Sequence, residues 1–192
     1  MTSSDPLLDL IVRYVRLTDA DAEQILTAWG ASRVIGSGDV LLAPGQRCRH
    51  VWFLDEGYGR FYTETEAADV TRHFISPGTY FTVVSSLYSG RPSQEGLQAI
   101  TSGRLRVLSA EANDRLKAMC PTWDAFREAY IREVYTYLDD MLDTMRSQTA
   151  MERYRAFEQD SPDILLNVPL RYIASYLGMT PQSLSRIRAQ HR

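Results

Sequence analysis

The spacing of apolar residues divides the chain into a helical start, a β-rich middle and a helical second half. Within residues 5–30, apolar side chains recur at the three- and four-residue intervals of a helix, at Leu7, Leu8, Ile11 and Val15. Thr18 followed by Asp21 is typical of the start of a second short helix, which continues through Ile25. We therefore predict helical structure at the start of the chain.

From Arg33 onward, short runs of β-branched and aromatic residues alternate with turns marked by glycine and proline. The predicted strands cover residues 40–42, 51–54, 59–62, 73–75, 97–101 and 105–108. Strands of this length at roughly ten-residue spacing are typical of a small barrel or jelly roll. The fold class expected is α+β, with N-terminal helices and an antiparallel, jelly-roll-like β-roll.

A stripe of large apolar side chains at helical spacing then predicts one amphipathic helix of about 25 residues. The stripe consists of Trp123, Phe126, Tyr130, Val134, Tyr137, Met141 and Met145. Such a helix either packs on its own domain or pairs with a second subunit. The stripe is longer than a small barrel can cover, which favours a dimer seam. A further short helix is expected over residues 149–159.

The last 25 residues, 168–192, fit a helix-turn-helix. Gly178 lies at the predicted turn, where a left-handed backbone angle is needed, and the small Ala174 allows the two helices to approach. Thr180 suits an N-cap, and Pro181 suits the first position of the second helix. The inward positions are all apolar: Ile173, Leu177, Met179, Leu184 and Ile187. A helical hairpin without a DNA role needs the same packing, but not the exposed polar and basic residues beside it.

Charge along the chain supports a DNA-binding role for this segment. The whole chain has a formal net charge of −3, but residues 168–192 contain four arginines and no acid, leaving −7 on the rest. A basic end on an acidic body is expected where one small module meets phosphate. Gln182 and Arg186 are predicted to read adenine and guanine edges. Thr180, Ser183 and Arg188 are predicted to hold phosphate, and Ser185 suits either role.

Composition places few other limits on function. Hydrophobic residues make up 44% of the chain and charged residues 23%, which is ordinary for a soluble protein. No run of 18 apolar residues occurs, and the first six residues lack the layout of a signal peptide. The chain has two cysteines, Cys48 and Cys120, which lie far apart in the sequence and in no paired spacing. A reduced cytoplasm is therefore the expected location. The sequence stops at Arg192, shortly after the second helix, so we expect DNA contact to rest on that helix and its amides rather than on a β-hairpin wing.

The order of helices, β-roll, long helix and helix-turn-helix resembles the Crp/Fnr superfamily of regulators, which are built on a cyclic-nucleotide-binding-type domain. The resemblance covers nearly the whole chain and is carried by residues 38–45, 51–62, 78–81, 89–93, 97–100 and 172–187. The last of these strings is especially similar to the branch common in Bacteroidetes. The resemblance implies a sensor domain over residues 1–113, a long dimerisation helix over 114–147 and a DNA-binding domain over 148–192.

The same resemblance implies a cytoplasmic homodimer that presents two recognition helices to a pseudo-palindromic double-stranded DNA site, without enzymatic activity. RNA polymerase is a further candidate partner, and no membrane partner is expected. In the cyclic-AMP-responsive members, a Glu binds the ribose hydroxyl and an Arg binds the cyclic phosphate. With Gly90 as the anchor, Val83 and Ser93 occupy those two positions.

Neither valine nor serine supplies the chemistry of the residue it replaces, because a buried phosphate needs a cation. We therefore expect an effector other than cyclic AMP, if there is one. A cyclic-nucleotide-responsive regulator is the alternative, because Arg91 lies two residues upstream of Ser93. The candidate effector pocket comprises Tyr80, Phe81, Val83, Arg91, Ser93 and Gln94.

No cofactor or metal site is predicted. Two isolated cysteines do not hold an iron–sulfur cluster, and His50 and His73 are weak candidates for haem ligands. A cupin-like enzyme needs several histidines and a glutamate on one face, and these two with His191 do not form that set. A protein-interaction module is the remaining alternative to a DNA-binding regulator.

Overall fold

The N-terminal segment forms two short helices. The computed structural model describes residues 5–66 and 69–190, without the side chains at 145, 146 and 190. Helix α1 (Pro6–Ile11) begins where the carboxylate of Asp5 accepts the Leu7 amide at 2.9 Å. Helix α2 (Asp19–Trp29) begins with a capping box in which Thr18 and Asp21 accept each other's amides. The predicted helical start is confirmed.

The middle of the chain is a β-roll of two four-stranded antiparallel sheets, as predicted. One sheet has the order β1-β8-β3-β6 and the other β2-β7-β4-β5. The strands are β1 (Arg33–Ile35), β2 (Val40–Leu42), β3 (His50–Glu56), β4 (Gly59–Glu64), β5 (Asp69–Ile75), β6 (Thr79–Phe81), β7 (Gly96–Ala99) and β8 (Gly103–Ser109).

Strand β3 joins the two main cores of this part of the molecule. Because side chains alternate between the faces of a strand, Val51 and Phe53 pack against the helices, while Trp52 and Leu54 pack between the sheets. All four are at most 2% exposed. The helices therefore rest on the back of one sheet, and the roll keeps its own interior.

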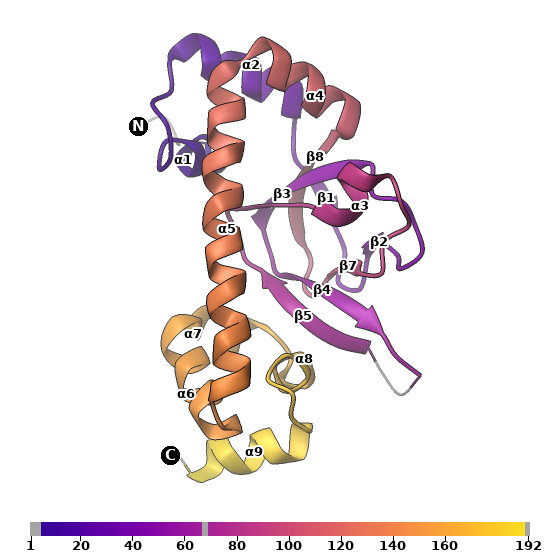
Figure 1. Cartoon of the computed structure of the whole chain (residues 1–192), viewed down its shortest axis with the longest axis vertical. Coiled ribbons are helices and arrows are strands. Elements are labelled where there is room, and N and C mark those ends of the chain that lie inside the picture. Colours follow the sequence, from indigo (N-terminus) through magenta and orange to yellow (C-terminus); the bar gives the residue numbers. More distant parts are fainter. Residues whose placement is uncertain (1–4, 67–68, 191–192) are drawn as a thin grey trace.

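A short helix, α3 (Val84–Ser89), follows β6, and α4 (Ala110–Met119) follows β8. Cys120 then has extended backbone angles, and α5 (Pro121–Ser147) begins with proline at its first position. The long helix therefore starts at Pro121, and residues 114–119 belong to α4. Figure 1 shows α5 running the length of the molecule, with α1, α2 and α4 gathered at one end and the last helices at the other.

Four helices follow α5: α6 (Ala150–Asp160), α7 (Pro162–Asn167), α8 (Leu170–Tyr176) and α9 (Pro181–Gln190). They share a core that also takes Ile100 from the roll, with Tyr58 and Phe74 packed against it. The C-terminal helices are therefore docked on the roll as well as on α5.

Several short elements were not predicted, namely β1, β6, α3, α4 and α7. Strands β1 and β6 have three residues each, too few for an alternating pattern. The strand expected over residues 97–101 ends at Ala99, because the amides of Ile100 and Thr101 both donate to the carbonyl of Tyr58.

Candidate nucleic-acid interface

Helices α8 and α9 form the predicted helix-turn-helix. Ile173, Ala174 and Leu184 are fully buried where the two helices meet. Gly178 has φ of +69°, and the amide of Met179 donates to the carbonyl of Ala174 at 2.9 Å. A residue with a Cβ is strained at this angle, which is why glycine suits the turn. Thr180 Oγ1 accepts the Ser183 amide at 3.1 Å, as an N-cap does.

The outer face of α9 carries polar side chains in contact with solvent. Gln182, Ser183, Ser185 and Arg186 are exposed, while Leu184 between them anchors the helix. Arg188 is partly buried and interacts with the Tyr154 hydroxyl on α6. The six predicted DNA-binding residues thus lie on one helix or at its cap, although Arg188 is less free than the others.

A further arginine lies on the first helix of the pair. Arg171 on α8 is exposed, and its guanidinium lies over the ring of Tyr172 at 4.6 Å and donates to its hydroxyl at 3.0 Å. Described residues 168–190 contain Arg171, Arg186 and Arg188 and no acid. His191 and Arg192 lie outside the described residues. The positive charge expected from the sequence is therefore concentrated around the helix pair.

A buried arginine joins the helix pair to the β-roll. Arg60 on β4 is 2% exposed, and its guanidinium lies between the ring of Tyr62, at 4.7 Å, and the ring of Tyr172, at 4.3 Å. It also donates to Gln98 at 2.8 and 3.0 Å and forms an ion pair with Asp69 at 3.1 Å. We call this cluster of Arg60, Tyr62, Tyr172, Gln98 and Asp69 the Arg60 joint.

A second attachment holds α8 along the edge strand of the roll. The amide of Thr71 on β5 donates to Ser175 Oγ at 3.0 Å, so a side chain of α8 takes a hydrogen bond that another strand would otherwise take. Sheet edges with unpaired amides favour such covering contacts. The joint and this bond together attach α8 to the β-roll.

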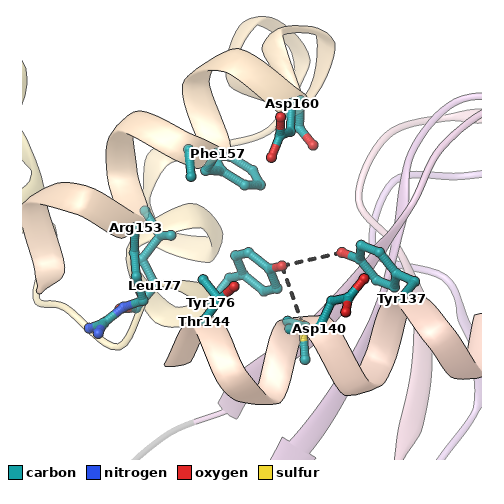
Figure 2. Close-up of a pocket in the computed structure, with 11 residues that line it drawn as sticks. Tyr137, Asp140, Thr144, Arg153, Phe157, Asp160, Tyr176 and Leu177 are labelled. Atoms are coloured by element: carbon teal, nitrogen blue, oxygen red, sulfur yellow. Dashed lines mark hydrogen bonds between the residues drawn. The ribbon is translucent and has the colours of Figure 1, made fainter. Parts of the chain in front are cut away.

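The far end of α5 also contacts the helix pair (Figure 2). The hydroxyls of Tyr137 and Tyr176 lie 3.4 Å apart, and Tyr176 donates to Met141 Sδ at 3.5 Å. Arg153 donates to the carbonyls of Leu177 and Gln148. These side chains border a cavity of about 370 Å³ between α5, α6 and α8. The long helix thus ends in direct contact with the first helix of the pair.

The predicted α5 stripe divides into two parts. Trp123 and Phe126 are 0% exposed and lie in a core with α1, α2 and the roll, so they are not available to a partner, contrary to the expectation that the whole stripe forms a seam. Tyr130 packs partly against the same core. Val134 is 37% and Tyr137 55% exposed, Met141 is partly buried, and the side chain of Met145 lies outside the described ones.

Exposed apolar residues that the stripe missed extend this surface. Ile131, Tyr135 and Leu142 are 37%, 71% and 49% exposed on the same helix. Each of them directly follows a residue of the predicted stripe in the sequence. A search for a second apolar face on the same helix would therefore have found them. The exposed apolar surface of α5 thus begins at Ile131.

The six candidate effector-pocket residues do not share one pocket. Tyr80, Phe81 and Val83 line a cavity of about 430 Å³ between the roll and α5. Arg91 and Gln94 line a neighbouring, open hollow of about 690 Å³, which shares Ser85 and Glu95 with that cavity. Ser93 is 3% exposed and lines neither, because its hydroxyl donates to the Glu95 carbonyl and accepts the Glu95 amide.

The cavity beside α5, which we call the roll–helix cavity, includes a histidine and a carboxylate that the predicted pocket lacks, His73 and Glu95. Burial lowers the pKa of His73 to about 4, and His73 Nδ1 is buried without a hydrogen-bond partner in the described structure. Burial also raises the pKa of Glu95, against the opposing charge of Arg72. His73 is therefore neutral near pH 7.

Within residues 5–66 and 69–190, no group of three or more histidine, cysteine or carboxylate side chains is placed to hold a metal ion. Both cysteines are buried and unpaired. Among the described helices, none combines the length and the apolar character that crossing a lipid bilayer requires.

The fold has many solved counterparts, although no family model and no curated protein matches the sequence. FixK2 of Bradyrhizobium japonicum aligns with a TM-score of 0.69 at 20% identity, over 83% of each chain. The catabolite activator protein of Thermus thermophilus aligns with a TM-score of 0.59 at 17% identity, over 97% of this chain and 86% of its own.

A transcriptional regulator assigned to the Crp/Fnr family, from Eubacterium rectale, aligns with a TM-score of 0.69 at 13% identity, over 89% of this chain and 82% of its own. The second of these proteins is named as an activator and the third as a transcriptional regulator. With its β-roll, long helix and C-terminal helix pair in the same order, this chain has the fold of the Crp/Fnr transcription regulators.

Proposed function

We propose that this protein is a sequence-specific DNA-binding transcription regulator that acts as a homodimer. The observation that carries the proposal is the outer face of α9, where Gln182, Ser183, Ser185 and Arg186 are exposed on a helix anchored by the buried Leu184. A second helix held this way by a first is the element that enters the major groove in helix-turn-helix proteins. The proposal places the protein in the cytoplasm, where it meets DNA and RNA polymerase.

Two side chains on that face are assigned to base readout. Gln182 and Arg186 are exposed, and no hydrogen bond or ion pair within the described chain engages either side chain. Arg188 has a partner in Tyr154, which suits a contact that positions the helix on the phosphate backbone. The Thr180 cap and the amides at the start of α9 add neutral phosphate contacts.

Dimerisation is assigned to α5 from Ile131 onward. Tyr135 and Leu142 are 71% and 49% exposed there and lie outside the roll–helix cavity, while Ile131, Val134 and Tyr137 are 37–55% exposed and also border that cavity. Clusters of exposed apolar residues of this kind mark interaction sites, and a two-fold axis along α5 pairs this surface with its own copy. Two recognition helices would then meet one face of DNA about 34 Å apart.

Control by an effector other than cyclic AMP is assigned to the roll. The roll–helix cavity is bordered by strands and also by Tyr130, Val134 and Tyr137 of α5, so its occupant contacts the proposed dimer helix directly. An effector changes DNA binding only if it binds the two states of the dimer with different affinity, and contact with α5 provides such a difference.

Selection of binding sites from random DNA, with and without cyclic AMP and cyclic GMP, tests the proposal. We expect an enriched pseudo-palindrome that is the same under all three conditions. No enriched motif under any condition would refute DNA recognition, and a motif that appears only with a cyclic nucleotide would refute the effector assignment.

Arg186→Ala tests the assignment to base readout. It should cost about 1–3 kcal/mol of specific binding and relax the preference at one position of the site. The control is Arg47→Ala, which removes an exposed arginine between β2 and β3 and should leave binding unchanged. An equal loss on all DNA sequences would assign Arg186 to phosphate instead.

Salt dependence separates DNA binding from use of the helix pair as a protein interface. A dimer that neutralises several phosphates releases condensed counterions, so its affinity for DNA should fall steeply as salt rises. Weak binding to DNA that is independent of salt would favour the protein-interaction alternative.

A further inference from the structure

The roll–helix cavity has an apolar wall on both sides. Phe61, Phe81 and Val83 border it from the roll and α3 side, and Ile131 and Leu138 border it from α5. Its volume of about 430 Å³ is within the range of small-molecule sites, about 300–1,000 Å³. The cavity is therefore large enough for a molecule of two or three fused or linked rings.

No lysine or arginine is among the described residues that line this cavity. The wall contains one histidine, His73, and one carboxylate, Glu95. Burial lowers the pKa of His73 and raises the pKa of Glu95, and both shifts favour the neutral form of the side chain. An anionic ligand would lose its water without direct contact with a cation, because Arg72 acts on His73 and Glu95 only from the neighbouring hollow, and that loss is unfavourable. The wall thus selects against phosphate and sulfonate groups.

The nearby arginines lie beside the wall without lining it. Arg127 is 4% exposed, pairs with Asp124 at 3.2 Å and bonds the hydroxyls of Tyr80 and Tyr88, which line the cavity, while its Nε is buried without a partner among the described residues. Arg72 and Arg91 line the neighbouring open hollow rather than this cavity. The polar and apolar parts of the predicted effector pocket are therefore neighbouring hollows that share Ser85 and Glu95.

We propose that the roll–helix cavity binds an uncharged, mainly aromatic small molecule whose single polar group meets the imidazole of His73 or the carboxyl of Glu95. This inference rests on the proposed function, because it names the class of effector for the same cavity. Apolar contact over the ligand's rings provides the affinity, and the polar residues fix its orientation. Because both α5 and the roll form the wall, the ligand holds one against the other.

Two fluorescent probes with one skeleton test the charge requirement on the full chain. N-phenylnaphthylamine is uncharged, and anilinonaphthalene sulfonate is the same molecule with one sulfonate. We expect saturable binding of the uncharged probe, at least about tenfold tighter than that of the sulfonate, with no displacement by cyclic AMP. Equal or tighter binding of the sulfonate, or displacement by cyclic AMP, would overturn the proposal.

A matched pair of substitutions tests the location. Val84 lines the cavity and is 46% exposed, so Val84→Trp fills space there without disturbing a core. Val34 on β1 is 73% exposed and lies away from the cavity, so Val34→Trp is the control. We expect Val84→Trp to raise the dissociation constant of the uncharged probe at least about tenfold, and Val34→Trp to change it less than about twofold.

If both variants bind the probe as the unchanged protein does, the probe lies elsewhere, for example on the exposed face of α5, and the site assignment is wrong. Gel-shift binding to the selected DNA, measured on the same preparations, keeps the two proposals distinct. If the unchanged protein binds the selected DNA but not the uncharged probe, only this inference is refuted. If it binds the probe but no DNA, only the proposed function is refuted.

Discussion

The Arg60 joint predicts a measurable coupling between the β-roll and the helix pair. The test is a double-mutant cycle with Arg60→Met on β4 and Tyr172→Leu on α8. Each substitution removes one partner of the contact between the guanidinium and the Tyr172 ring, 4.3 Å apart, and replaces it with an apolar side chain. The cycle isolates this contact because Arg60 keeps its bonds to Gln98 when only Tyr172 is changed.

The expected coupling energy is about 1–2 kcal/mol. Contacts between a cation and an aromatic face contribute about 0.5–1 kcal/mol at exposed sites and about 2 kcal/mol or more where water is excluded. Arg60 is 2% exposed, while Tyr172 is partly buried, so the contact falls between these limits. The ion pair with Asp69 adds little, because the side chain of Asp69 is 51% exposed.

Urea unfolding followed by circular dichroism gives the free energies of the four proteins in the cycle. The control is a second cycle on the same ring, with Arg171→Met in place of Arg60→Met. Arg171 lies over Tyr172 at a similar distance, 4.6 Å, but is exposed to solvent. Its coupling, which also includes the hydrogen bond to the Tyr172 hydroxyl, should be about 0.5–1 kcal/mol and smaller than that of Arg60.

Equal coupling energies for the two arginines would refute the argument that burial of Arg60 strengthens the contact. A coupling near zero for Arg60 would show that the helix pair is not held to the roll through this ring. In that case the joint stabilises the roll alone, through Tyr62 and Gln98.

Three further predictions concern the turn, the dimer and the buried histidine. Gly178→Ala should destabilise the protein by about 1–2 kcal/mol, seen as a lower Tm, because φ is +69° there; an unchanged Tm would show that the turn relaxes. Leu142→Glu should shift the sedimentation equilibrium from dimer toward monomer, whereas Met119→Glu, at an equally apolar but more exposed site on α4, should not; equal shifts would refute the α5 seam. Folding lowers the pKa of His73 from 6.5 to about 4, so between these values the unfolded chain binds more protons and stability falls as the pH drops, by about 3 kcal/mol at most. Urea unfolding across this pH range should therefore show that the free energy of unfolding depends less on pH in His73→Phe than in the unchanged protein. The variant His50→Phe, at an exposed site, should keep most of the pH dependence. The same pH dependence in the unchanged protein and both variants would assign the effect to other groups.

Features set by neighbours in the chain were predictable. The turn at Gly178, the cap at Thr180 and the capping box at Thr18 and Asp21 depend on residues within three positions of each other, and all appear as expected. The main strands of the roll were predicted from β-rich runs separated by glycine and proline turns. Residues close together in the sequence were therefore enough to predict the order of the main helices and strands.

Features that depend on contacts distant in sequence were not predictable. The stripe from Trp123 to Met141 reads as one face, yet its first part is buried by α1 and α2, and only tertiary packing decides where that burial stops. Likewise, the Arg60 joint brings together residues more than one hundred positions apart. Tyr80 and Arg91 seemed neighbours in one pocket, but α3 between them directs them to different hollows.

Helix α5 is anchored in a core at its start and contacts α8 near its end, and its exposed apolar surface lies along the second half. A tilt of this helix at its start therefore moves its far end. Its base is fixed among Trp123, Phe126 and Tyr130, and its far end contacts Tyr176 on α8. At a rise of 1.5 Å per residue, the 17 steps from Tyr130 to Ser147 span roughly 25 Å, so a swing of about 10° at the base moves the far end by roughly 4 Å. Under the proposed function, a displacement of this size exceeds the rise of one base pair, about 3.4 Å, so a change near the cavity that tilts α5 would shift the recognition helix by about one step along its groove.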